Sequence, residues 1–317
     1  MLLRFGYVAI ALDVPQGSPN KTVTVKVLEK ITDPVGRLHR LRRILRENLE
    51  TTLRVLRYNA KNQIHLYRFT SKTVPLATHP LTAGWDYIEE YRPQWEELGD
   101  YIRQTGLRVS AHPDHFTLLN SPQPEVLTAS LQDLEYHARL FDAMRLPPGP
   151  QLVLHIGGLY KDKAAPMDRF IQQYTRLPAT LGQRLMLEND DKSYHAADVL
   201  ALCRKTGCPM ILDVHHHACL PCDTPLAKLW PDIVATWQGN RPKIHISSPK
   251  SAKDFRSHAD FVNAADLTEF LAVAKDCGQD VDIMVEAKQK DLALFRLVED
   301  LARLPGITRV EPAALEL

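Results

Sequence analysis

The sequence has no apolar run long enough to cross a membrane and no low-complexity segment, which argues against a membrane protein or a disordered chain. The number of cysteines, five, is odd. The N-terminal apolar stretch does not have the pattern of a secretory signal, because it is short and lies between Arg4 and Asp13. We therefore expect reduced thiols, a cytoplasmic location, no membrane contact and no obligate protein partner. Net charge is also almost absent, with 39 basic against 38 acidic residues, so the whole chain has no basic bias toward nucleic acid.

Short apolar runs alternate with amphipathic segments along the chain. The sequence predicts strands at residues 4–10, 64–69, 107–111, 151–155, 185–188, 209–213, 242–246 and 281–286. Helices are predicted at residues 38–58, 85–105, 124–144, 167–182, 195–206, 225–238, 265–277 and 290–302. Eight strands that are each followed by a helix predict an α/β fold, a single (β/α)8 TIM barrel over residues 1–317. The segments 15–34 and 217–225 are expected to be loops at its mouth.

Six of these strands end on a histidine or a carboxylate. The six residues are His112, His155, Glu188, Asp213, His245 and Glu286. A TIM barrel builds its active site from the C-terminal ends of its strands, so these side chains should converge on one face. Each one alone is readily explained as a core or capping residue, but six in succession favour a multi-metal centre.

The residue types indicate which metals the centre binds. Imidazole and carboxylate together bind Mn²⁺, Fe, Co²⁺ and Zn²⁺, and the lack of cysteine at the strand ends argues against structural zinc. We expect two to three divalent ions, Mn²⁺ before Mg²⁺, Co²⁺ or Zn²⁺. The pair Cys219 and Cys222 has CxxC spacing but no second pair, so we assign it no role.

Lys243 lies two residues before His245 on a predicted strand, so both side chains point to the same face. A free ammonium beside two or three cations would be repelled. Lys243 is therefore expected to be a substrate anchor or a modified, neutralised ligand.

Basic residues form local clusters. They lie at residues 37–46, at Lys161 and Lys163, at residues 250–256 and at residues 288–290. The first has the pattern of a solvated helix face, whereas the other three follow predicted strand ends. Clusters of this kind are what a nucleic-acid partner requires, although charge alone does not decide the question.

A series of short motifs extends from residue 4 to about residue 303. In order they are RFGYV (4–8), LYRFTS (66–71), VPLATHP (74–80), HP (112–113), LHIGG (154–158), LENDD (187–191), DVHHH (213–217), KIHISSP (243–249), SHAD (257–260) and MVEAK (284–288). In this order the set resembles the UV damage endonucleases, metal-dependent DNA-repair nucleases. Their TIM-barrel fold is also used by endonuclease IV and xylose isomerase.

The resemblance implies roles for individual residues. It implies metal ligands at His79, His112, His155, Glu188, Asp213, His216, His245, His258 and Glu286. Of these, Glu188, Asp213 and His245, together with Lys243, are expected to carry the catalysis. Lys243 matches a lysine that is carboxylated in relatives, and Tyr7, Lys161 and Lys163 match positions near the DNA.

One stretch departs from the family pattern. Relatives usually place a Gln and an aromatic residue after the His-Pro pair, and these two enter the duplex at the lesion. Here the sequence is HPDHF, so His115 replaces the Gln, Phe116 keeps the aromatic ring, and Asp114 adds a negative charge. We expect His115 and Phe116 to fill the gap that an extruded lesion leaves in the stack.

The function implied by the resemblance is nicking of duplex DNA 5′ to UV lesions, both pyrimidine dimers and 6-4 photoproducts. Such nicks leave 3′-hydroxyl and 5′-phosphate ends, and the enzyme would associate with the nucleoid during repair. Two enzymatic alternatives stay open, an abasic-site endonuclease of the endonuclease IV type and a metal-dependent sugar isomerase or epimerase, because fold does not settle function. A DNA-binding or metal-storage module gives no reason for a water-activating cluster.

Overall fold

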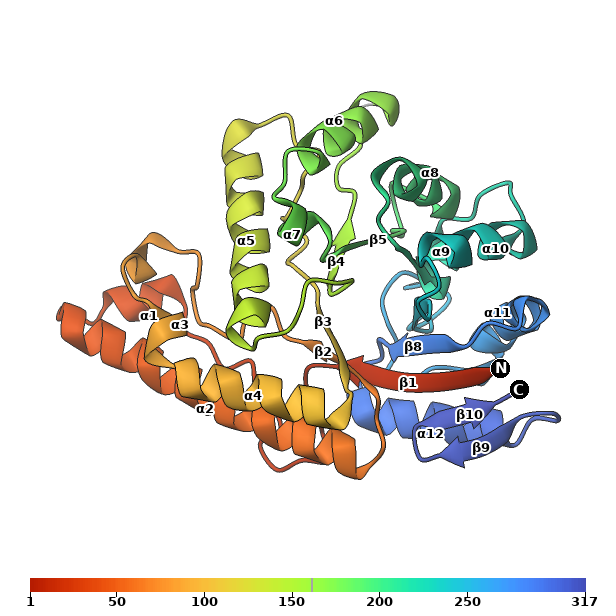
Figure 1. Cartoon of the computed structure of the whole chain (residues 1–317), viewed down its shortest axis with the longest axis horizontal. Helices are drawn as coiled ribbons and strands as arrows, with labels where there is room; N and C mark the ends of the chain where they lie inside the picture. Colours follow the sequence, from red (N-terminus) through yellow and green to blue (C-terminus); the bar gives the residue numbers. More distant parts are fainter. Residues whose placement is uncertain (161) are drawn as a thin grey trace.

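The computed structural model describes residues 1–160 and 162–317, and Figure 1 shows its elements. The strands are β1 (Leu2–Val8), β2 (Leu66–Phe69), β3 (Arg108–Ala111), β4 (Leu152–His155), β5 (Leu185–Glu188), β6 (Met210–Asp213), β7 (Lys243–Ile246), β8 (Val281–Val285), β9 (Thr308–Glu311) and β10 (Ala314–Glu316). Strands β1 to β8 pair in parallel and in chain order, and β8 also pairs with β1, which closes the sheet. The predicted TIM barrel is confirmed.

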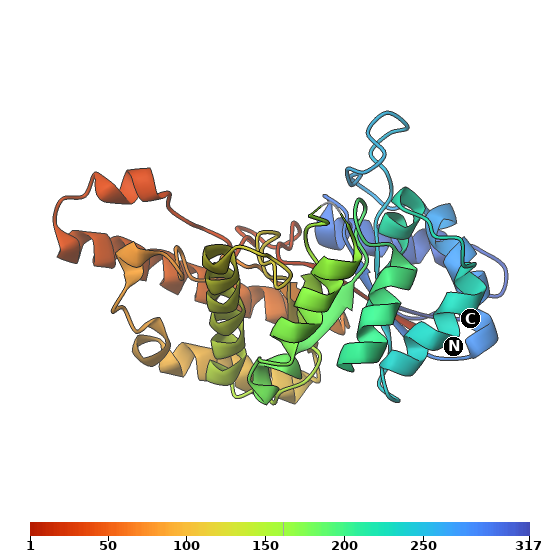
Figure 2. The ribbon, with the colours of Figure 1, turned by 90° about the horizontal axis from the view of Figure 1, so that it is seen from above.

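Helices surround this barrel, as the view from above shows (Figure 2). They are α1 (Val25–Glu29), α2 (Pro34–Lys61), η1 (Pro80–Thr82), α3 (Tyr87–Glu90), α4 (Arg92–Thr105), α5 (Pro124–Ala143), α6 (Ala164–Tyr174), α7 (Ala179–Gly182), α8 (Ala196–Thr206), α9 (Val214–Cys219), α10 (Leu226–Thr236), α11 (Ala264–Cys277) and α12 (Lys290–Ala302). None of the described helices combines enough length and apolar character to span a bilayer.

Closure of the barrel depends on a close approach of two strands. Gly6 of β1 lies opposite Leu66 of β2, and a Cβ at Gly6 would lie 2.3 Å from the Leu66 Cβ. Any larger residue at this position would push the two strands apart, so closure requires glycine here.

Side chains inside the barrel form layers, because successive residues of a strand point to opposite faces. Val153, Met186 and Ile211 form a buried apolar cluster with Trp237. Each of the three strand residues lies two positions before a predicted ligand on the same strand, so this cluster forms the layer directly below the ligands. The apolar layer supports the site and keeps water out from below.

The opposite end of the barrel is closed by a buried ion-pair cluster. The fully buried carboxylate of Asp282 lies 2.8 Å from the Nε of Arg4, 2.7 Å from Arg108 and 3.6 Å from Arg241. Burial raises the pKa of Asp282, but Arg4 and Arg108 outweigh it and hold that pKa below its usual range. The charged end and the ligand-bearing end are therefore separate.

Several predicted boundaries were wrong. The segment 15–34 contains α1, whose Thr24 side chain accepts a hydrogen bond from the Val27 amide, and the turn after β6 is the helix α9. The predicted helices at 85–105 and 167–182 are each two helices, broken near Tyr91 and Thr175. The hairpin of β9 and β10, which pairs antiparallel with β1, was missed because it is too short for periodicity to identify.

Candidate metal centre

Two groups of metal-ligating side chains meet at the C-terminal ends of the strands. His112, His155 and Glu188 form the first group, and Glu188, Asp213, His245 and Glu286 form the second. Together they are the six strand-end residues predicted from the sequence. The structure therefore brings all six together, and Glu188 belongs to both groups.

Glu188 connects the two groups through its two carboxylate oxygens. Its Oε2 lies 3.2 Å from the Nε2 of His112 and 3.5 Å from the Nε2 of His155. Its Oε1 lies 2.7 Å from the Nδ1 of His245, which is also 3.0 Å from a Glu286 oxygen. Burial raises the pKa of Glu188, but His245 and His155 outweigh it and lower that pKa well below the usual value. Glu188 is therefore an anion that both groups share.

Three histidines have their ring orientation and tautomer fixed by backbone carbonyls. The Nδ1 of His112 lies 2.9 Å from the Pro113 carbonyl. The Nδ1 of His216 lies 2.9 Å from the Asn189 carbonyl, and the Nδ1 of His258 lies 2.8 Å from the Glu286 carbonyl. Because a carbonyl only accepts, Nδ1 carries the proton in each ring, and in the neutral ring Nε2 keeps its lone pair. Metal-binding histidines are oriented by hydrogen bonds of this kind.

Several nitrogen and oxygen atoms of these side chains have no hydrogen-bond partner, which also fits a metal site. Among the described residues, Asp213 Oδ2, His155 Nδ1 and His245 Nε2 are buried and have no hydrogen-bond partner. Buried polar atoms without a partner are costly and call for an explanation such as an ion. Carboxylate and imidazole donors without thiolate suit a divalent cation, so the residues fit the expected group.

Carboxylates also change the protonation of two histidines in the metal-free protein. Burial lowers the pKa of His216, but Asp213 and Glu188 outweigh it and raise that pKa to about 9. Burial also lowers the pKa of His245, but Glu188 and Glu286 outweigh it and raise that pKa to about 9. Each of these rings must lose a proton before it can bind a metal.

Lys243 is fully buried below His245, and its Nζ donates a hydrogen bond to the Ser110 hydroxyl at 3.2 Å. Burial and the nearby Arg108 guanidinium lower its pKa well below the usual value, although Asp282 opposes them. The surroundings of Lys243 therefore favour the neutral amine over the ammonium, which would reduce the predicted repulsion from bound metals.

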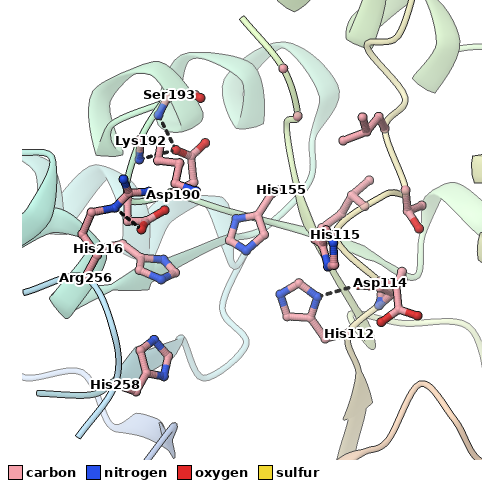
Figure 3. Close-up of a pocket in the computed structure, with 17 residues that line it drawn as sticks. His112, Asp114, His115, His155, Asp190, Lys192, Ser193, His216, Arg256 and His258 are labelled. Carbon is pink, nitrogen blue, oxygen red and sulfur yellow. Dashed lines mark hydrogen bonds and ion pairs between the residues drawn. The ribbon is translucent and has the colours of Figure 1, made fainter. Parts of the chain in front are cut away.

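The two groups lie beneath an open cavity of about 450 Å³. His112, His155, His216 and His258 line it (Figure 3). The carboxylates of Glu188 and Asp213 are buried and do not line it. The ring centroids of His216 and His258 are 6.2 Å apart, and those of His155 and His216 are 5.8 Å apart. The structure thus brings His216 and His258, two of the three further histidines implied by the resemblance, beside the strand-end residues.

A family model described as UV-endonuclease UvdE matches residues 3–317. The chain belongs to the UV-endonuclease UvdE family. The UV DNA damage endonuclease of Bacillus cereus (strain G9842) is 41% identical over 318 residues, which is 100% of both chains. That of Bacillus anthracis (strain A0248) is 39% identical, again over 100% of both chains. The predicted family is confirmed.

Solved structures agree with this assignment. The crystal structure of SacUVDE covers 95% of this chain and 100% of its own, with a TM-score of 0.84 and 28% identity. Endonuclease IV from Thermus thermophilus covers 94% and 99%, with a TM-score of 0.53 and 14% identity, which shows a common fold alone. As a UvdE protein, this chain is a UV-damage repair endonuclease that acts on DNA.

Two residues implied by the family resemblance lie elsewhere. His79 precedes η1, accepts a hydrogen bond from the Leu81 amide at 3.1 Å, and lines a separate cavity with Tyr87 and Arg139. Neither metal-ligating group contains it. Tyr7 is fully buried and donates to the Asn59 side chain at 2.7 Å, so the expected contact between Tyr7 and DNA is wrong for this structure. Alternation along β1 turns Tyr7 outward, under α2.

The residues expected to contact the lesion are at the surface of the mouth. Phe116 is 48% exposed, and the neighbouring His115 ring is also exposed, 6.2 Å away and edge-on. Lys163 forms an ion pair with Asp198 of α8 at 2.6 Å. Lys161 lies outside the described residues.

Three further residues of the site were missed from the sequence. Arg68 of β2 forms an ion pair with the Glu286 carboxylate. Asn189 forms two hydrogen bonds with the Asp213 backbone, of 2.9 and 3.0 Å, and so fixes the end of β6. Arg256 lines the cavity and pairs with Asp191 at 2.6 Å. Arg68 and Asn189 lie within the quoted motifs, but only the barrel shows what they contact.

Proposed function

We propose that the protein nicks duplex DNA immediately 5′ to UV lesions, both cyclobutane pyrimidine dimers and 6-4 photoproducts. The products carry 3′-hydroxyl and 5′-phosphate ends. The nick requires two to three divalent ions, with Mn²⁺ preferred. The observation that supports this most is the Glu188-centred pair of ligand groups beneath an open cavity in a UvdE-family barrel.

The proposed ligands are the residues of the two groups, with His216 of α9 and His258 beside them. In chain order they are His112, His155, Glu188, Asp213, His216, His245, His258 and Glu286. When bound, divalent ions supply charge for the scissile phosphate and lower the pKa of water so that hydroxide exists near neutral pH. His79 is left out of the set because it lies in another cavity.

The chain's own residues hold the reacting groups in place. Glu188 keeps the two ligand groups at a fixed separation, and Asn189 orients Asp213 through the backbone. In the reaction a water oxygen bonds to phosphorus and the bond to the 3′ oxygen breaks. One proton passes from the water to that oxygen, which leaves as the 3′-hydroxyl, so one water is consumed for each nick.

We propose further that Lys243 is carboxylated in the active enzyme. A neutral amine is the form that adds carbon dioxide, and burial and Arg108 favour that form of Lys243. The nitrogen bonds to the carbon of carbon dioxide and releases one proton, and the carbamate formed is an anion that the Arg108 and Arg68 charges stabilise. Incorporation of labelled bicarbonate, followed by carbon-13 NMR, checks this against a Lys243→Met variant.

Recognition of the lesion depends on DNA deformation. A lesion that already unstacks the duplex costs less to kink and extrude, by roughly a few kcal/mol. The exposed pair His115 and Phe116 fills the space left in the stack. Because His115 replaces the Gln usual in relatives, the range of accepted lesions is the property most sensitive to this site.

The test uses chelator-treated protein with and without added Mn²⁺, and four labelled duplexes: one dimer, one 6-4 photoproduct, one abasic site, and no damage. An Asp213→Asn variant is compared with Asp232→Asn, a surface carboxylate on α10 that pairs with Arg204. We expect a single nick 5′ to each UV lesion that needs Mn²⁺ and is lost only in Asp213→Asn. Cleavage at the abasic site alone favours the endonuclease IV type of activity. No cleavage of any duplex contradicts the proposal and makes free sugars the next substrates to test.

A further inference from the structure

The loop between β7 and α11 rises from the mouth of the barrel. In Figure 2 it is the blue loop that projects above the rest of the molecule. Its base is a short antiparallel bridge between Pro249 and His258, and the Lys250 amide donates to the Ser257 carbonyl at 2.7 Å. We refer to residues 249–258 as the arm. The paired base makes it a defined hairpin-like element.

The arm is anchored to the strand ends that carry the metal centre. Arg256 pairs with Asp191, which follows β5, at 2.6 Å. His258, at the base of the arm, lies 2.8 Å from the Glu286 carbonyl through its Nδ1. A ligand of the arm would therefore meet an ordered surface, which reduces the entropy lost on binding.

The tip of the arm presents an aromatic ring and positive charge to the solvent. Phe255 is 42% exposed, and its ring centroid lies 5.7 Å from that of His215. Lys253 is exposed and has no ion pair among the residues that the structure describes, whereas Lys250 pairs with Asp254 at 3.4 Å. Exposed aromatic rings beside unpaired cations are the combination that binds nucleic-acid strands.

The arm lies opposite the expected lesion-contacting residues. Arg256 and His258 lie on one side of the metal cavity, and Asp114 and His115 lie on the other (Figure 3). Phe116 follows His115 and lines a neighbouring cavity with Lys72, and Phe255 precedes Arg256 and lines another neighbouring cavity with His215. An exposed phenylalanine thus lies next to the metal cavity on each side.

We propose that the arm is a second DNA-contacting element, in which Phe255 stacks against the damaged strand and Lys253 binds its phosphate. This rests on the proposed function, namely binding of lesion-containing duplex across the cavity. With Phe116 on one side of the metal cavity and Phe255 on the other, the kinked strand is held on both sides of the lesion.

The first test measures DNA affinity and turnover separately. In Phe255→Ala, Kd for a dimer-containing duplex should rise about tenfold, since one base–aromatic stack is worth that order of affinity. Turnover at saturating DNA should stay unchanged. In Lys253→Gln, the slope of log Kd against log salt should fall by about one. The control Val310→Ala removes an exposed apolar side chain from β9 and should change neither.

Loss of turnover in Phe255→Ala with unchanged Kd would overturn the proposal, because it would mean that the ring only supports His215. Proximity is checked with a photoreactive benzoylphenylalanine at position 255 and, as control, at position 310. Cross-linking to the damaged strand from position 255 alone supports the arm as a DNA contact. If wild-type protein nicks dimers but the protein with benzoylphenylalanine at position 255 forms no cross-link, the proposal for the arm is refuted and the proposed function is not. Wild-type protein that neither binds nor nicks dimers refutes the proposed function.

Discussion

Metal loading should release protons, because two of the proposed ligands are protonated in the metal-free protein. The pKa values of His216 and His245 are raised to about 9, so both rings are almost fully charged near pH 7.5. Glu188 and Glu286 have pKa values well below the usual range and bring no protons to release. Loading should therefore release about two protons per protein molecule near neutral pH. The number should fall toward zero as the pH rises past the two histidine pKa values.

Isothermal titration of chelator-treated protein with Mn²⁺ measures this number. The same titration is repeated in buffers of different ionisation enthalpy, and the slope of observed heat against ionisation enthalpy gives the protons released. His245→Gln should lower the slope to about one, and His39→Gln, a histidine of α2 outside the site, should leave it unchanged. A slope near zero in the wild-type protein would show that neither ring gives up a proton on loading, and the proposed ligand set would be wrong.

Three substitutions separate structural from functional roles. Tyr7→Phe leaves the buried Asn59 oxygen without its donor and should lower the free energy of unfolding by about 1–3 kcal/mol in urea titration, with unchanged turnover; a DNA defect in a stable variant would contradict this. Asn189→Ala frees the end of β6 and should weaken Mn²⁺ binding roughly 10- to 100-fold by titration; unchanged affinity would exclude a positioning role. Phe116→Ala should lower affinity for dimer-containing duplex, but not for undamaged duplex, by about 1–3 kcal/mol in anisotropy assays. Equal loss on both duplexes would refute lesion recognition by this ring.

The barrel and the strand-end ligands were predictable because both follow from simple periodicities. Alternation along a strand, and the rule that barrel sites form at C-terminal strand ends, are sufficient to bring His155, Glu188 and Asp213 together. The same alternation places Tyr7 on the outward face of β1 with Leu3 and Phe5, beneath the helices. Similarity to family motifs does not show on which face of β1 the Tyr7 side chain lies, which is why the predicted contact between Tyr7 and DNA was wrong.

The three consecutive histidines after β6 show where sequence reasoning stops. They lie in α9, whose first turn is capped by the Asp213 carboxylate, which accepts a hydrogen bond from the His216 amide at 2.7 Å. The helical rotation then points only His216 into the metal cavity, while His215 and His217 line another cavity with Phe255. Without knowledge of that helix, spacing could not select one histidine of the three.

Asp213 illustrates how the fold couples backbone order to the chemistry of the site. One of its oxygens caps α9 and fixes His216, and the other is buried without a partner among the described residues. Asn189 holds the same residue through both backbone groups. A rotation of this carboxylate would therefore break a helix cap and release a histidine as well as displace a ligand. The second oxygen is kept in position by interactions that do not depend on a metal, so the ligand set is preorganised before an ion binds.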